Sequence, residues 1–177
     1  MKLTPTVQRC ILHWGEMAGR WGVSRSVAQI HALLFLSPQP LIAEEIAETL
    51  AVARSNVSVS LKELQQWDLV SVTHVLGDRR DYFQARKDIW EVLAVILDGR
   101  KKREIDPTVQ TLRECVAEAA GGRGAGDARS AERLVAMLGF FDTMESWYDE
   151  LRAMPLADVQ RLVRMGSRLR RLLGARS

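Results

Sequence analysis

The spacing of apolar residues predicts a chain that is mostly helical. Residues 24–37, SRSVAQIHALLFLS, begin with a capping serine and become apolar on nearly every side, which predicts a buried helix. This helix ends before the prolines that follow, because proline disfavours helical geometry in the residue before it. Residues 41–50 predict a short second helix with Leu41, Ile46 and Leu50 available for a core.

Residues 54–67, RSNVSVSLKELQQW, predict a third helix whose two faces differ. Val57, Leu61 and Leu64 stand at i, i+4 and i+7, which predicts a buried stripe. The opposite face is small, polar and lightly cationic, and it carries Ser55, Asn56, Ser58, Val59, Lys62 and Gln66. Ordinary solvent-facing helices hold more Glu and Lys and fewer Ser. Two helices joined by a short turn, the second with such a face, are typical of a helix-turn-helix.

The segment after this helix predicts a β-hairpin. Residues 68–75, DLVSVTHV, alternate in the manner of a strand, residues 76–81 contain a glycine and several charges, and residues 81–85 return. A hairpin that follows the third helix directly would form the wing of a winged helix-turn-helix.

Two arginines lie in the predicted turn of this hairpin, Arg79 and Arg80, between Asp78 and Asp81. A narrow DNA minor groove concentrates negative potential and attracts arginine. We expect the two aspartates to hold the guanidinium groups, since arginine pairs with carboxylate through a planar fork. A turn that is merely solvated is the alternative.

The remainder of the chain predicts four more helices, at residues 88–104, 106–120, 128–154 and 156–173. Asp106 before Pro107 is expected to be an N-cap that restarts the helix. Residues 121–130 contain four glycines and are expected to be a linker. The last helix carries an apolar stripe that needs a partner surface, namely Leu156, Val159, Val163, Gly166, Leu169 and Leu173.

Composition excludes several classes of protein. The chain has 177 residues, 47% of them apolar, and a net charge of +3, which predicts a folded protein with one hydrophobic core, or a small module plus a helical extension. It shows neither a membrane-spanning run nor a signal peptide, so we expect a cytoplasmic protein without a membrane partner. There is no P-loop, dinucleotide fingerprint or nucleophile elbow, so we expect no enzyme and no cofactor.

Histidines and cysteines give no sign of a metal site. His13, His31 and His74 lack metal-ligand spacing, and His31 falls on an apolar helix face where we expect a hydrogen-bonded core histidine. Cys10 and Cys115 lie far apart, and we expect both to be small buried hydrophobes, with a redox-sensing thiol as the alternative.

Charges are segregated in the second half of the chain. Residues 161–177 hold six arginines and no acid, whereas residues 138–150 hold four acids and no base. These blocks could pair within a helical bundle or across subunits; solvated helix faces are the alternative.

A long stretch of the chain resembles a known family. The run GRWGVSRSVAQIHALLFLSPQPLIAEEIAETLAVARSNVSVSLKELQQWDLV, followed by GDRRDYF, resembles the GbsR-like branch of the MarR superfamily of bacterial transcription regulators. The resemblance implies a homodimeric winged helix-turn-helix protein whose terminal helices build the dimer. Three positions depart from the family pattern: Ile42 replaces Thr or Ser, Ala51 replaces Gly, and Ala53 replaces Ser. These changes remove two cap hydroxyls and would strain Ala51 if its φ is positive.

The predicted fold is therefore mainly α with a small β-hairpin. Residues 1–21 are expected to form an N-terminal dimerisation helix, residues 22–87 a winged helix-turn-helix domain, and residues 88–177 a helical region for dimerisation and effector sensing. The expected function is that of a homodimeric transcriptional regulator, a repressor modulated by a small molecule. The alternative is an interaction module that has lost DNA binding, against which the wing arginines and the serine-rich helix face argue.

Double-stranded DNA is the expected partner. We expect phosphate contacts from Arg25, Arg54 and Lys62, and contacts to base edges from Ser55, Asn56 and Ser58, with Val59 against a thymine methyl group. A quaternary amine is a candidate effector, for which aromatic side chains could form a cage, although aromatics on helices more often pack in a core. The tryptophans available for such a cage are Trp14, Trp21, Trp90 and Trp147.

Overall fold

The computed structural model describes residues 3–121 and 128–173, with side chains described as far as residue 166. The chain divides into two compact units, residues 1–99 and residues 100–177. No helix in these described ranges is long and apolar enough to cross a membrane.

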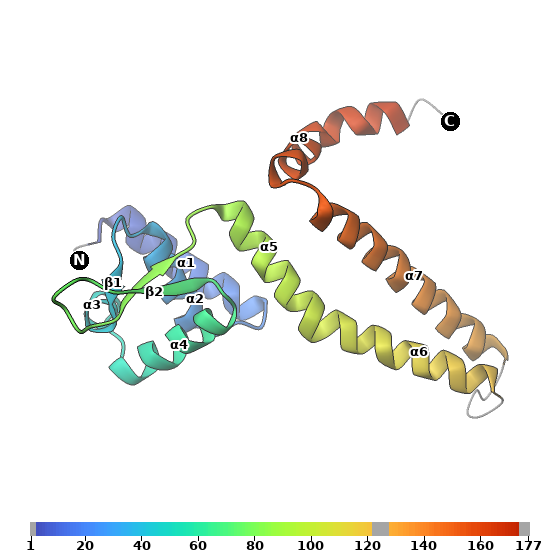
Figure 1. Cartoon of the computed structure of the whole chain (residues 1–177), viewed down its shortest axis with the longest axis horizontal. Helices are drawn as coiled ribbons and strands as arrows, with labels where there is room; N and C mark the ends of the chain where they lie inside the picture. Colours follow the sequence, from blue (N-terminus) through green and yellow to red (C-terminus); the bar gives the residue numbers. More distant parts are fainter. Residues whose placement is uncertain (1–2, 122–127, 174–177) are drawn as a thin grey trace. The chain divides into compact units, whose positions relative to one another are not determined.

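The first unit contains five helices and three short strands (Figure 1). In chain order they are α1 (Pro5–Arg20), α2 (Arg25–Leu36), β1 (Leu41–Ile42), α3 (Ala43–Leu50), α4 (Arg54–Gln66), β2 (Val70–Thr73), β3 (Tyr82–Ala85) and α5 (Ile89–Arg100), whose last residue belongs to the second unit. This order confirms the predicted fold class.

The core of the first unit forms around α2. Ile30, Leu33 and Leu34 of this helix are fully buried, as its all-round apolar pattern predicted. They share one hydrophobic cluster with Ile46 of α3 and with the buried stripe of α4. Helix α1 packs on α2 at Gly15, where a Cβ atom would come within 2.6 Å of Gln29.

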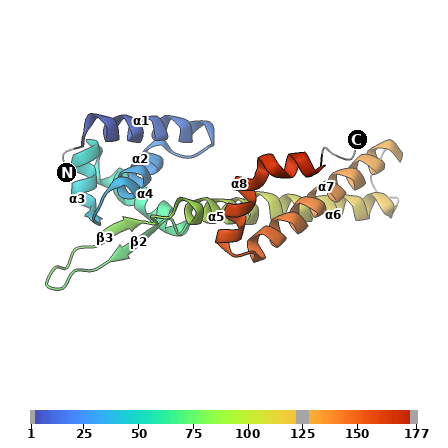
Figure 2. The same cartoon turned by 90° about the horizontal axis from the view of Figure 1, so that it is seen from above.

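The sheet has three strands, in the order β1-β3-β2, and all pairs are antiparallel. Strands β2 and β3 form the predicted hairpin, with Val72 opposite Phe83, and Figure 2 shows them side by side with their connecting loop at one end. The prediction that Leu41 and Ile42 begin a helix was wrong. Both side chains are buried, and both residues pair with β3 instead of starting α3.

Burial of His31 is confirmed, but the expectation that it is hydrogen-bonded was wrong. Its side chain is buried and its Nε2 atom has no hydrogen-bond partner in the described structure. Burial, and secondarily the charge of Lys87, lowers the pKa of His31 to about 4, so the ring is neutral at physiological pH. The expectation for the cysteines also fails, since Cys10 is exposed and Cys115 is half-buried.

The second unit begins with a π-helical turn (Lys101–Ile105), followed by α6 (Asp106–Ala120), α7 (Ala128–Ala153) and α8 (Leu156–Leu173). Asp106 is not the predicted N-cap, because its φ of −56° and ψ of −45° are helical. The π-helical turn leads directly into α6, and the Asp106 carboxylate instead accepts a hydrogen bond of 2.7 Å from Lys101 Nζ. Of the predicted linker, residues 122–127 lie outside the described residues.

Helices α6 and α7 form a helical hairpin held by apolar and ionic contacts. Val109 and Leu112 of α6 are buried, and Arg113 Nη2 lies 3.0 Å from Asp142 and 3.2 Å from Glu145 of α7. Two of the four acids in residues 138–150, Asp142 and Glu145, thus pair with Arg113 of α6, and Glu145 also pairs with Lys101, whereas Arg161 pairs with Asp158. The side chains of Arg168, Arg170, Arg171 and Arg176 lie outside the described residues, as do those of Leu169 and Leu173.

The turn between α3 and α4 places an alanine in left-handed geometry. Ala51 has φ of 52° and ψ of 45°, a region in which a Cβ atom crowds the following carbonyl oxygen. The next helix begins after Ala53, whose φ of −62° and ψ of 140° are those of an N-cap, without a side-chain acceptor. At the start of α3, Ile42 likewise offers no acceptor, and only the Glu45 carboxylate caps this end, 3.0 Å from Ile42 N.

The substitution Ala51→Gly should raise the free energy of unfolding by about 0.5–1 kcal/mol. Glycine removes the strain of positive φ, and this gain exceeds the loss that comes from the greater conformational entropy of glycine in the unfolded chain. Ala47→Gly, in the interior of α3, should instead lower the free energy of unfolding by about 1 kcal/mol. Urea unfolding of both variants checks this. An unchanged or lower midpoint for Ala51→Gly would contradict the strain.

Ala53→Ser should stabilise α4 by about 1 kcal/mol, because the serine hydroxyl can accept from a free N–H group in the first turn. The control is Ala53→Val, which adds volume without an acceptor and should not stabilise. The same urea experiment measures both variants, and a gain for valine as large as that for serine would show that capping is not the cause.

Candidate nucleic-acid interface

Helix α4 presents one face to the core and the opposite face to solvent. Val57, Leu61 and Leu64 are almost completely buried, which confirms the predicted stripe. The opposite face is exposed, and its side chains have no hydrogen-bond or ion-pair partner among the described residues: Ser55, Asn56, Val59, Lys62 and Gln66. Val59 is 67% exposed, so its two methyl groups face solvent. The helix therefore offers free donors, acceptors and methyl groups on a rigid element.

Arg54 and Ser58 are already engaged within the protein. The Arg54 Nε atom lies 2.8 Å from Glu44 Oε1 of α3, and its Nη1 atom donates to the Ser58 hydroxyl one turn further along α4. This hydrogen bond from Arg54 lowers the pKa of Glu44, so the pair stays ionised at neutral pH. Arg54 thus connects the two helices of the helix-turn-helix, a role that the sequence did not reveal.

Arg80 is held rigidly at the tip of the wing. Its Nε atom lies 2.9 Å and 3.0 Å from the two carboxylate oxygens of Asp78, and its Nη2 atom donates to Asp78 and, at 3.1 Å, to the Tyr82 hydroxyl. The Tyr82 hydroxyl in turn donates to Asp78 at 2.9 Å. The hydrogen bonds from Arg80, followed by that from Tyr82, hold the pKa of Asp78 well below its usual range. The wing therefore keeps its shape through a closed polar network.

Arg79 is exposed, as Arg80 is, but unlike Arg80 it has no partner among the described residues. The prediction that both aspartates hold arginines is confirmed for Asp78 and wrong for Asp81. Asp81 faces His74 across the hairpin, with 3.7 Å between Asp81 Oδ1 and His74 Nδ1. Arg79 is consequently a wing cation whose charge is not compensated by a direct contact.

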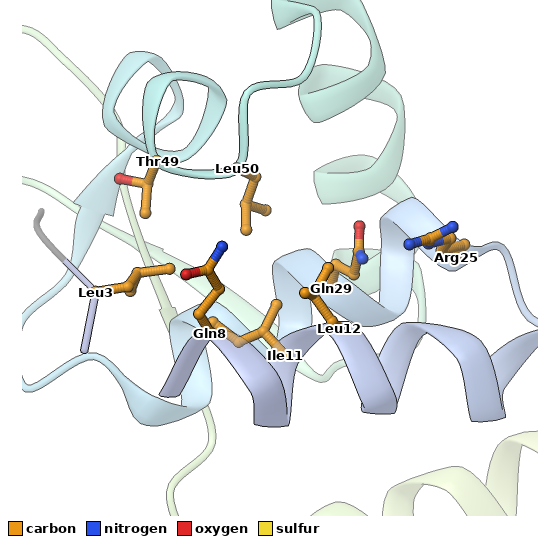
Figure 3. Close-up of a pocket in the computed structure, with 8 residues that line it drawn as sticks. All are labelled: Leu3, Gln8, Ile11, Leu12, Arg25, Gln29, Thr49 and Leu50. Carbon is orange, nitrogen blue, oxygen red and sulfur yellow. The ribbon is translucent and has the colours of Figure 1, made fainter. Parts of the chain in front are cut away.

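Arg25, the first residue of α2, lies beside an open cavity of about 400 Å³ in the first unit (Figure 3). The cavity is lined by Leu3, Gln8, Ile11, Leu12, Arg25, Gln29, Thr49 and Leu50. Thr49 and Leu50 end α3, immediately before the strained turn at Ala51. None of the predicted tryptophans lines this cavity.

The four tryptophans lie on separate elements. Trp14 is on α1, Trp21 follows its last residue, Trp90 is in the first turn of α5, and Trp147 is on α7 of the second unit. Ring contacts in the structure include His31 with Phe35 and Phe140 with Phe141. The aromatic cage stays a prediction.

Two further cations contact the chain just beyond α4 and at the end of α2. Arg86 donates from Nε to the Asp68 carbonyl at 2.7 Å and also contacts the Asp68 carboxylate, which ties β3 to the end of α4. Lys87 Nζ donates to the carbonyls of Leu34, Phe35 and Ser37 at 2.8, 3.0 and 2.6 Å. A cation is favourable at a helix C-terminus, but only the folded chain brings Lys87 to the end of α2.

Comparisons with known proteins agree with this geometry. A sequence profile described as MarR family matches residues 21–81, which span α2 to the wing. A solved structure described as a transcriptional regulator superposes over 89% of this chain and 99% of its own, with a TM-score of 0.61 and 20% identity, which establishes the likeness of fold.

A second comparison is with the sequence of one related protein. The HTH-type transcriptional repressor GbsR of Bacillus subtilis (strain 168) is 24% identical over 103 residues, which are 58% of this chain and 57% of the relative. The match thus spans little more than half of either protein. Together with the profile match over residues 21–81 and the winged helix-turn-helix geometry, it supports a GbsR-like member of the MarR superfamily.

Proposed function

We propose that the protein is a sequence-specific DNA-binding transcriptional regulator that acts as a homodimer. The observation that carries the proposal is the outer face of α4, where Ser55, Asn56, Val59 and Lys62 are exposed and unpartnered while the inner face is buried. The major groove of DNA offers base-edge donors, acceptors and thymine methyl groups, and this face provides the complementary groups.

The proposed contacts divide by chemistry. Asn56 and Ser55 read base edges, Val59 packs against a thymine methyl group, and Lys62 contacts phosphate. Ser58 can contact a base only if its hydroxyl gives up the hydrogen bond from Arg54 and forms one with DNA. Arg54 and Arg25 lie in the first turns of their helices, where free N–H groups also favour a phosphate.

The proposal includes repression and modulation by a small molecule. The relative from Bacillus subtilis is named a repressor, which supports that sign of regulation. MarR-family regulators act as dimers and some bind small ligands, which supports both the homodimer and an effector. A quaternary amine is the ligand to test first. A two-fold dimer would place its recognition helices about 34–36 Å apart, one turn of DNA, or at multiples of that distance.

Arg79→Ala should weaken binding to a preferred and to a scrambled duplex alike, because a wing arginine interacts with groove shape and phosphates. It should also reduce the slope of log K against log salt by about 0.9 for each lost phosphate contact. Arg80→Ala should change the slope less, since Asp78 already compensates its charge. Fluorescence anisotropy across a salt series measures these slopes. If neither variant alters affinity or slope, the wing is only a solvated turn.

Asn56→Ala should cost about 1–3 kcal/mol on the preferred duplex and almost nothing on the scrambled one, because it removes a base-edge contact. Gln65→Ala is the matched control, an exposed amide on the same helix outside the proposed face. Fluorescence anisotropy with both duplexes at one salt concentration measures the affinities of both variants. Equal losses on the two duplexes would show that Asn56 does not read sequence.

A further inference from the structure

A leucine lies completely exposed at the tip of the wing. Leu76 has a relative exposure of 103%, and Val75 before it is 49% exposed. Both belong to the loop between β2 and β3, which Figure 2 shows projecting beyond the two strands. The same loop carries Arg79, which is exposed and has no partner among the described residues. The wing tip, residues 75–80, thus combines exposed apolar side chains with a positive charge.

Local geometry holds Leu76 in place before any partner binds. The Asp78 backbone N–H donates to the Val75 carbonyl oxygen at 3.0 Å, which closes a four-residue turn. Gly77 has a φ of 84°, the value that the third residue of a type II turn requires, so Leu76 is the second residue of that turn. The Asp78 carboxylate also accepts a hydrogen bond of 3.0 Å from the Arg80 backbone N–H, which fixes the end of the turn. A backbone so constrained loses little conformational freedom when its leucine is buried against a partner.

We propose that Leu76 inserts into the minor groove of DNA beside Arg79, where its side chain packs against the sugars and the groove floor. The hairpin follows α4 directly, so a tip in the minor groove continues the surface that α4 presents to the major groove. The negative potential of a narrow minor groove attracts the Arg79 cation. Proteins that bind this groove insert apolar side chains such as leucine. The inference rests on the proposed DNA-binding function and assigns to it a residue that reads groove shape.

Base pairs differ in the minor groove by one group that a leucine can detect. A·T pairs present only acceptor atoms there, whereas a G·C pair adds the amino group of guanine. This amino group projects from the groove floor and leaves less room for a branched side chain. It also loses its hydrogen bond to water where an apolar group covers it. Leu76 therefore favours A·T pairs through close approach, without forming a hydrogen bond.

Salt dependence separates this apolar contact from the ionic contact of Arg79. In fluorescence anisotropy with the full chain and a duplex selected from a random pool, Leu76→Ala should weaken binding about fivefold to tenfold, because apolar contact area is lost. The slope of log K against log salt should not change, because no phosphate contact is lost. Leu76→Met keeps the apolar volume and should bind within about twofold of the wild type. An unchanged affinity or a smaller slope for Leu76→Ala would overturn the proposal.

Inosine tests which groove Leu76 occupies. Three duplexes keep the enriched positions and carry A·T, inosine·C or G·C pairs elsewhere. An inosine·C pair has the major-groove pattern of G·C but lacks the minor-groove amino group. The wild type should bind the A·T and inosine·C duplexes at least about threefold more tightly than the G·C duplex, and Leu76→Ala should lose most of this preference. An equal preference in both proteins would show that Leu76 does not approach the groove floor.

Two controls exclude misfolding and a general effect of apolar truncation. Because Leu76 is completely exposed, Leu76→Ala should leave the midpoint of urea unfolding unchanged. Val135 of α7 is 57% exposed and lies outside the wing, so Val135→Ala should leave the DNA affinity unchanged. A loss for Val135→Ala as large as that for Leu76→Ala would contradict a contact specific to the wing tip.

The proposed function fails separately from this inference. If the pool yields no enriched sequence, duplexes made wholly of A·T, inosine·C or G·C pairs replace the selected ones. A preference among these duplexes that depends on Leu76 would support the minor-groove contact in a protein that reads no sequence through α4. A protein that selects a sequence but binds equally well with Leu76→Ala refutes only the role of Leu76.

Discussion

The buried stripe of α4 determines what this protein can present to DNA. Val57, Leu61 and Leu64 are locked into the cluster that α2 organises, so the rotation of α4 about its own axis is fixed. Burial of three such side chains contributes on the order of 5 kcal/mol, far more than any exposed contact on the helix. The outer face, with Asn56 and Val59, is thereby held in one orientation without bonds of its own.

Polar contacts between residues of different helices and strands complete the arrangement around α4. Lys87 closes the end of α2, Arg86 joins β3 to Asp68 after α4, and Arg54 joins α4 to Glu44 of α3. Each lies at an element end, where backbone groups lack partners or the chain must turn. The strain at Ala51 persists because the packed helices on both sides determine the turn between them.

The sequence predicted those features that depend on local pattern. The stripe of α4, the ends of α2 and the hairpin follow from periodicity and from proline and glycine positions. Strand β1 was missed because Leu41 and Ile42 show no alternation and pair with Tyr82 and Phe83, some forty residues away. Asp106 was wrongly predicted to be an N-cap, because the π-helical turn before it continues directly into α6 and leaves Asp106 with helical backbone angles. The engagement of Arg54 with Glu44 also required the fold, since an exposed arginine on a recognition helix reads as a phosphate contact.

The central claim is that the outer face of α4 reads a DNA sequence, and selection of bound duplexes from a random pool tests it most directly. The account predicts enrichment of a two-fold symmetric site whose half-sites are about one helical turn, or a multiple of it, apart. Recovery of duplexes without any common sequence, at a salt concentration where the protein is folded and DNA is retained, would contradict it.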